Sequence, residues 1–311
     1  IHPAPKRWIA TTFALLALAL SIPGYTKVLH EERSVYTRII VEDERNLRCL
    51  KFTLVRENSR QTCMDRNNPQ RLVFDYAKMT LSALLLKPDP ERILIIGLGG
   101  GTLPMALRDI LPSAVIDTVE IDEAVVRVAK RFFDFAEDDQ NRVYVQDARV
   151  FGKRAVLRGE QYDLIILDAF DGEYIPEHLM TVEFLSEMRG LLSDDGVLVA
   201  NTFASSKLYD YESATYAEAF GGFLNFRLPT SGNRVILVPQ AKLDIDARTP
   251  LDRKTLRANA DALEAPVAPY DMPLKRYVST LLSLSEQKPD WNSRIRPLTD
   301  QFSPANVLQS Q

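Results

Sequence analysis

The stretch Ile93-Leu94-Ile95-Ile96-Gly97-Leu98-Gly99-Gly100-Gly101-Thr102 decides the fold. Four apolar residues in a row are typical of a buried strand, and the glycines after them predict a turn into a helix. Glycine is needed at such a turn because a Cβ would block the approach of a ligand to the backbone N–H groups at the helix start. Thr102 stands where the dinucleotide fingerprint has its third glycine, which disfavours NAD.

Strands and helices alternate on both sides of this turn, between residues 92 and 239. Expected strands comprise residues 93–96, 115–120, 143–146, 162–167 and 197–201, and expected helices comprise residues 103–111, 123–133, 148–158, 182–192 and 211–220. A hairpin formed by residues 223–227 and 234–238 closes the series. The order predicts an α/β fold with a Rossmann-like, mostly parallel sheet of the methyltransferase type and helices on both faces.

The flanking sequence predicts smaller units. Residues 34–65 are β-rich and indicate a small antiparallel accessory domain, while residues 252–263 indicate a helical appendage. We therefore expect an N-terminal segment at 1–26, an accessory domain at 27–70, a nucleoside-binding catalytic domain at 71–240 and an appendage with a tail at 241–311.

The N-terminal segment resembles a leader. Lys6 and Arg7 precede an apolar run at residues 8–22, which is shorter than the roughly 20 residues needed to span a membrane. We expect a signal peptide or membrane anchor here, so that the protein is exported or associates with a membrane. An ordinary buried helix is the alternative, and a missing upstream helix would place the catalytic domain on the cytoplasmic face.

Composition excludes several classes of function. The formal net charge is -4, with basic and acidic residues interspersed, so nucleic acid is not an expected partner. The chain has 3 His and 2 Cys, which provide no cluster for a metal site, and we expect no metal. Cys49 and Cys63 are near enough in sequence for one disulfide, and two separate thiols are the alternative.

Acidic residues follow three of the expected strands. Glu120 ends the second strand, from which a carboxylate can reach ribose hydroxyls, and Asp147 and Asp168 follow the next two strands. Because ligands bind at the carboxyl ends of parallel strands, these side chains and the glycine turn should meet in one crevice. Each carboxylate alone could instead cap the helix after it. Together they indicate a nucleoside site.

A sulfonium nucleoside, S-adenosylmethionine or its decarboxylated form, suits this site because its positive sulfur activates the attached carbon for displacement. An amine acceptor arrives protonated, and a nearby carboxylate can hold the cation and accept its proton. Asp168 is the candidate base. The loop after it carries Asp171, Glu173 and Glu177, of which Asp171 is the best candidate for binding a cationic substrate. A solvated acidic loop is the alternative.

These motifs, in this order, resemble the spermidine synthases, the polyamine aminopropyltransferases, over residues 34–304. The resemblance implies a glycine-rich donor loop, a ribose-binding carboxylate, an adenine-side Asp-Ala pair, a catalytic Asp and a nucleoside-binding glutamine. The corresponding residues are Gly97, Gly99, Gly100 and Gly101, then Glu120, then Asp147 and Ala148, then Asp168, and Gln61. The stretch Leu298-Thr299-Asp300-Gln301-Phe302-Ser303-Pro304 resembles a tail common among such proteins. The resemblance also implies a homodimer.

Two positions depart from the family pattern. Gly100 replaces an Asp that binds the amine of the aminopropyl group, which leaves room for the carboxylate of intact S-adenosylmethionine. A Tyr-His/Gln-Glu motif that helps to hold the diamine is replaced by Phe74-Asp75-Tyr76-Ala77, where Tyr76 is the candidate for orienting the amine.

Three hypotheses follow. The first is transfer of an aminopropyl group from decarboxylated S-adenosylmethionine to a putrescine-like polyamine. The second is methyl transfer from S-adenosylmethionine, and the third is a non-catalytic envelope protein that keeps the fold.

Overall fold

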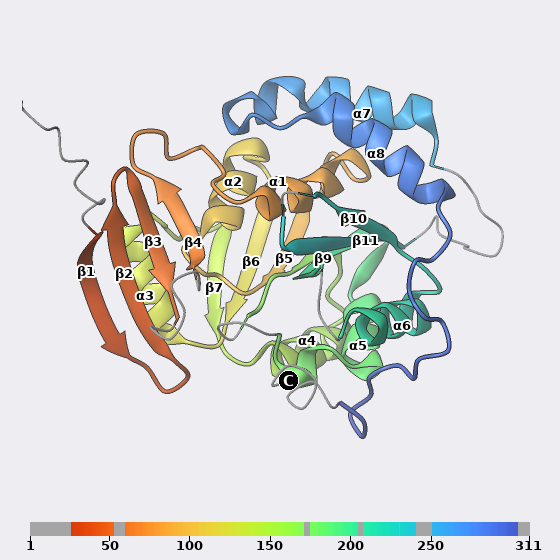
Figure 1. Ribbon diagram of the computed structural model, residues 1–311, viewed down its shortest axis with the longest axis horizontal. Helices are drawn as coiled ribbons and strands as arrows, with labels where there is room; N and C mark the ends of the chain where they lie inside the picture. Colours follow the sequence, from red (N-terminus) through yellow and green to blue (C-terminus); the bar gives the residue numbers. More distant parts are fainter. Residues whose placement is uncertain are drawn as a thin grey trace, which may run out of the picture.

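The computed structural model describes residues 26–52, 60–170, 175–204, 208–229, 231–240 and 251–303. Its centre is a seven-stranded sheet in the order β10-β11-β9-β8-β5-β6-β7 (Figure 1). The parallel strands are β5 (Arg92–Ile96), β6 (Val115–Glu120), β7 (Asn141–Val145), β8 (Tyr162–Leu167) and β9 (Leu192–Phe203). The antiparallel edge consists of β10 (Leu224–Arg227) and β11 (Asn233–Pro239). The predicted α/β fold is confirmed.

Helices cover both faces of this sheet because alternate side chains of each buried strand point to opposite faces. Ile93 and Ile95 of β5 belong to one core, and Leu94 and Ile96 belong to the other. The first core contains α1 (Asp75–Leu81), η1 (Ser82–Leu85), α2 (Thr102–Ile110), α7 (Arg253–Val267) and α8 (Leu274–Glu286). The second contains α4 (Ala148–Leu157), α5 (Val182–Gly190) and α6 (Tyr209–Phe220), on the lower side in Figure 1.

A four-stranded antiparallel sheet precedes the central sheet in the order β1-β2-β3-β4. Its strands are β1 (Thr26–Arg33), β2 (Arg38–Glu44), β3 (Leu47–Lys51) and β4 (Arg60–Asp65). Ile39, Val41 and Leu50 of this sheet pack against α3 (Glu123–Phe132), so α3 lies between the two sheets. Cys49 and Cys63 face each other across β3 and β4 and form a disulfide, which decides the alternative left open by the sequence.

The C-terminal part was only partly predicted. Helix α7 was expected at residues 252–263, and it continues to Val267 even though Pro266 lies inside it. Helix α8 was not expected; it follows Pro273 and packs Tyr277 against Phe226 of β10. Short 3-10 helices also occur, η2 (Glu177–Leu179) before α5 and η3 (Ala268–Tyr270) after α7.

The predicted leader at residues 8–22 lies outside the described residues. In the part of the chain that the structure describes, we find no helix with the length and apolar character needed to cross a membrane. The limits of the four segments given above stay predictions.

Candidate active site

A cavity of 290 Å³ lies where β5, β6 and β8 end, between the central sheet and the four-stranded sheet. Parallel strands that are neighbours in a sheet end at one edge, so residues far apart in sequence meet there. Predicted site residues from this edge that line the cavity are Gly97, Gly99, Glu120, Asp147, Ala148 and Asp168. Gln61 of β4 and Tyr76 of α1 line it from the other side. Asp171 lies outside the described residues.

The glycine turn adopts backbone conformations that other residues rarely adopt. Gly97 has a φ of 100° and Gly99 has a φ of 54°. A Cβ at Gly97 would lie 2.3 Å from the carbonyl oxygen of Asp168, so the turn can approach β8 this closely only with glycine. This contact fixes the position of the turn relative to Asp168.

Gly100 and Gly101 were also predicted to bind the donor, but neither lines the cavity. The N–H of Gly100 donates to Thr62 Oγ1 at 3.0 Å. A Cβ at Gly100 would lie 2.7 Å from Thr62 Cγ2 and 3.1 Å from the ring of Phe133. The expectation that position 100 leaves room for a donor carboxylate is therefore wrong: Thr62 and Phe133 fill that space.

Glu120 is buried and accepts hydrogen bonds from the backbone. Its Oε2 accepts from the N–H of Leu98 at 3.0 Å, and its Oε1 accepts from the N–H of Asp122 at 3.0 Å. Burial raises the pKa of Glu120, and these backbone bonds oppose that shift. A carboxylate has about four acceptor sites, so the Glu120 carboxylate keeps acceptor capacity for a hydroxyl donor of a ligand.

Asp147 begins helix α4 and pairs with a histidine that the sequence did not single out. Its Oδ1 accepts from the N–H of Val150 at 2.9 Å, which caps the helix. Its Oδ2 lies 3.0 Å from Nε2 of His178 on η2. Asp147, Ala148 and His178 thus form one wall of the cavity.

Asp168 follows β8 and is held by two neighbouring side chains. Asn201 Nδ2 donates to Asp168 Oδ1 at 2.8 Å, and the hydroxyl of Tyr76 lies 3.4 Å from Asp168 Oδ2. The residue is half-buried, yet protein atoms surround its carboxyl group closely. Burial raises the pKa of Asp168 to about 7, against the hydrogen bonds from Asn201 and Tyr76, which lower it. Burial and the charge of Asp168 raise the pKa of Tyr76 well above its ordinary value.

Asn201 and Asn233 form a chain of amides that ends on this carboxylate. Asn233 Nδ2 donates to Asn201 Oδ1 at 3.0 Å. Ionised Asp168 can only accept, so Asn201 must present its NH2 group there and its carbonyl oxygen to Asn233. Asn201 was not predicted as a site residue, although it is a polar residue near the end of the apolar strand β9. Thr62 had no comparable signal.

The fold agrees with that of solved spermidine synthases. A probable spermidine synthase from Corynebacterium glutamicum ATCC 13032 matches with a TM-score of 0.61 at 20% identity, over 86% of this chain and 98% of that chain. A spermidine synthase in complex with the transition state analogue AdoDATO matches with a TM-score of 0.57 at 21% identity, over 83% of this chain and 89% of that chain.

A polyamine aminopropyltransferase of Vibrio vulnificus (strain CMCP6) is 48% identical over 306 residues, which are 97% of this chain and 98% of the relative. An enzyme that matches nearly the whole chain contradicts two expectations, a membrane-anchored or exported protein and a non-catalytic envelope protein. The apolar run was a weak signal, because about 15 apolar residues suit a helix buried in a protein core as well as a leader.

The sequence model of the spermine/spermidine synthase domain matches residues 74–230, slightly more than half of the chain. This range contains the glycine turn and the acidic residues that line the cavity. The chain is a transferase and belongs to the spermine/spermidine synthase family.

Proposed function

We propose that this protein transfers the aminopropyl group of decarboxylated S-adenosylmethionine to an amine of a putrescine-like polyamine, with Asp168 as general base. The observation that carries the proposal is the carboxylate of Asp168, which lines the cavity between Asn201 and Tyr76 with its pKa raised to about 7.

The reaction needs a nucleophile and one proton acceptor. The amine nitrogen attacks the propyl carbon bonded to the sulfonium sulfur, and a new C–N bond forms. The C–S bond breaks, and its electron pair neutralises the sulfur, so the nucleoside leaves as methylthioadenosine. The proton of the amine passes to Asp168, which must be ionised to accept it.

A pKa near 7 suits Asp168 to this role. A carboxylate of ordinary pKa would be a much weaker base toward an ammonium group whose pKa is about 10. Asn201 keeps the ionised form accessible because its NH2 group donates to Oδ1. Tyr76 stays a phenol, since its pKa is raised, and can orient Asp168 or the amine.

The donor fits the other side of the cavity. Glu120 keeps acceptor capacity for a ribose hydroxyl, and Asp147 with Ala148 would take the adenine. Gly97 and Gly99 line the cavity, and a Cβ at Gly99 would lie 2.7 Å from Thr62 Oγ1, so glycine keeps this turn close to β4 at the place where the nucleoside would bind. Gln61 would contact the nucleoside from β4.

The acceptor would lie beside Asp168, with Tyr76 orienting its amine and Asp171 binding its positive charge. The support for a polyamine is the acidic loop and the enzyme name of the Vibrio vulnificus relative. A homodimer is proposed on the family resemblance, and sedimentation velocity of the purified protein would test it.

Calorimetric titration of the full chain with decarboxylated S-adenosylmethionine, intact S-adenosylmethionine and methylthioadenosine tests the donor. Tighter binding of the decarboxylated form is expected. Preference for the intact donor would favour methyl transfer instead, although Thr62 and Phe133 fill the space beside Gly100 that motivated that alternative. Binding of none of the three would refute the proposed site.

A further inference from the structure

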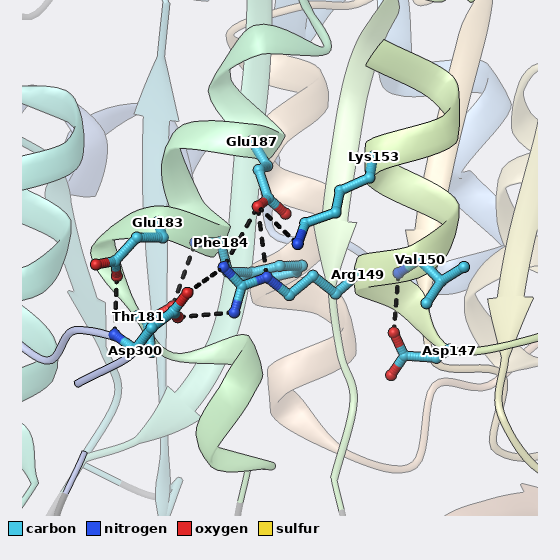
Figure 2. A network of polar contacts seen from close by, with 9 residues as sticks. All are labelled: Asp147, Arg149, Val150, Lys153, Thr181, Glu183, Phe184, Glu187 and Asp300. Atoms are coloured by element: carbon cyan, nitrogen blue, oxygen red, sulfur yellow. Dashed lines mark hydrogen bonds and ion pairs between the residues drawn. The ribbon is translucent and has the colours of Figure 1, made fainter. Parts of the chain in front are cut away.

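Asp300, in the C-terminal tail, makes a paired contact with the helix that begins at the cavity. Arg149 Nη1 donates to Asp300 Oδ1 at 2.7 Å and Arg149 Nη2 donates to Asp300 Oδ2 at 2.6 Å, a two-bond geometry visible in Figure 2. The Arg149 side chain is 14% exposed and that of Asp300 is 40% exposed. The hydrogen bond from Arg149 holds the pKa of Asp300 below its ordinary value, so the pair is ionised at neutral pH.

The same tail residue also holds the start of helix α5. Thr181 Oγ1 donates to Asp300 Oδ1 at 2.8 Å and accepts from the N–H of Phe184 at 3.2 Å, which caps α5. The N–H of Asp300 donates to Glu183 Oε2 at 3.0 Å. Figure 2 shows Asp300 beside Thr181 and Glu183 at the start of α5, with the Arg149 side chain reaching it from α4.

Leu298 anchors the tail two residues earlier. Its side chain is completely buried in a small core with Met180, and its carbonyl oxygen accepts from the N–H of Val182 at 2.9 Å. Its N–H donates to Thr215 Oγ1 of α6 at 2.9 Å. The backbone of the tail is thereby fixed, so Asp300 meets both helices at a defined position.

Helix α4 begins at the cavity, and α5 begins just after the cavity-lining residues of η2. Arg149 lies in the first turn of α4, two residues after Asp147. Helix α5 follows η2, whose His178 lies 3.0 Å from Asp147 and lines the cavity. From outside the cavity, Asp300 therefore links the first turn of α4 to the start of α5, which directly follows the η2 part of the wall for the adenine.

We propose that Asp300 is a positioning residue for donor binding, which holds the first turns of α4 and α5 at the spacing that the adenine end of the nucleoside requires. This inference rests on the proposed function, because it assigns that wall to the nucleoside. Asp300 touches no reacting atom and acts through Arg149 and Thr181.

The test compares Asp300→Ala and Asp300→Asn with wild type in the full chain, using methylthioadenosine and decarboxylated S-adenosylmethionine as probes. Lys153→Met is the matched control: Lys153 lies on α4 in the same network, but its side chain is 59% exposed and its ion pair with Glu187 spans 3.8 Å. Nucleoside Kd, acceptor KM, kcat at saturating donor and the melting temperature are measured for each.

Asp300→Ala is expected to weaken nucleoside binding about tenfold, within the range by which residues along a coupled network modulate affinity. The acceptor KM and kcat of Asp300→Ala should stay within about twofold of wild type. The nucleoside Kd of Asp300→Asn should lie between those of wild type and Asp300→Ala, and the Kd of Lys153→Met should match wild type. A lower melting temperature with unchanged nucleoside Kd would overturn the proposal, because it would show a purely structural role.

A second variant and the wild-type activity distinguish a failure of the positioning role from a failure to fold or of the proposed function. If Asp300→Ala does not fold, Arg149→Lys, which keeps the charge and loses the paired geometry, should weaken nucleoside binding in the same direction. If wild type binds methylthioadenosine but transfers no aminopropyl group, the proposed function fails while the positioning role remains measurable. If wild type binds neither nucleoside, the proposed function and the positioning role both fail.

Discussion

Replacing Asn201 by leucine, which is similar in size, tests the assignment of the base in most detail. Leucine removes the hydrogen bond to Asp168 Oδ1 and leaves a carboxylate with fewer donors. A hydrogen bond to a charged group contributes about 2 kcal/mol, and at about 1.4 kcal/mol per unit its loss raises the pKa of Asp168 by about 1.5 units, from about 7 to about 8.5.

Activity at neutral pH should fall, because only ionised Asp168 can accept the proton of the amine. At pH 7 the ionised fraction of Asp168 falls from about one half to about 3%, so kcat/KM should drop about fifteenfold. Above about pH 9 most of the rate should return, because the carboxylate is again ionised.

The assay is the pH profile of kcat/KM for the acceptor at saturating donor, expressed as the ratio of variant to wild type. The ratio cancels the titration of the acceptor amine, which is common to both proteins. A ratio that is low but constant from pH 6 to pH 9.5, within about twofold, would show that Asn201 does not act on the ionisation of Asp168 and would refute the reasoning.

Three more substitutions give distinct outcomes. Tyr76→Phe removes a longer, weaker hydrogen bond to Asp168 and should raise the apparent pKa of Asp168 in the pH profile of kcat/KM by only about 0.5 unit. A larger rise than in Asn201→Leu would contradict this ranking. Gly97→Ala should cost at least about 2 kcal/mol in the free energy of unfolding and weaken donor binding, measured by denaturation and calorimetry, because its Cβ would overlap a backbone oxygen; wild-type behaviour in both would contradict the geometry. Arg234→Met leaves Glu212 as an unpaired charge in the core and should cost about 3 to 5 kcal/mol in urea unfolding, which a loss under about 1 kcal/mol would disprove.

The central sheet and the acidic part of the site could be predicted because both are recorded locally in the sequence. Glu120 and Asp168 each follow an apolar strand, and parallel strands must end at one edge, so their meeting follows from the order of elements. Gly97 could be predicted as a turn residue at this edge because the glycine turn directly follows an apolar strand in the sequence.

Residues that reach the site across long separations were not predictable in this way. Thr62 comes from the four-stranded sheet, and its contact with Gly100 depends on how the two sheets pack, which no spacing records. Asn201 is a polar residue near the end of the apolar strand β9, which is weak evidence for a site residue. Its partner Asn233 lies on the antiparallel strand β11, so their contact does not follow from the order of parallel strands. The contacts of Asp300 depend on the path of the tail past α5 and α6, which is set by the burial of Leu298.

Turnover of the full-length wild-type protein with decarboxylated S-adenosylmethionine and putrescine tests the central claim most directly. Mass spectrometry should detect the amine with one added aminopropyl group together with an equal amount of methylthioadenosine, and Asp168→Asn should abolish both. A methylated amine formed from intact S-adenosylmethionine, or no product from the decarboxylated donor, would contradict aminopropyl transfer.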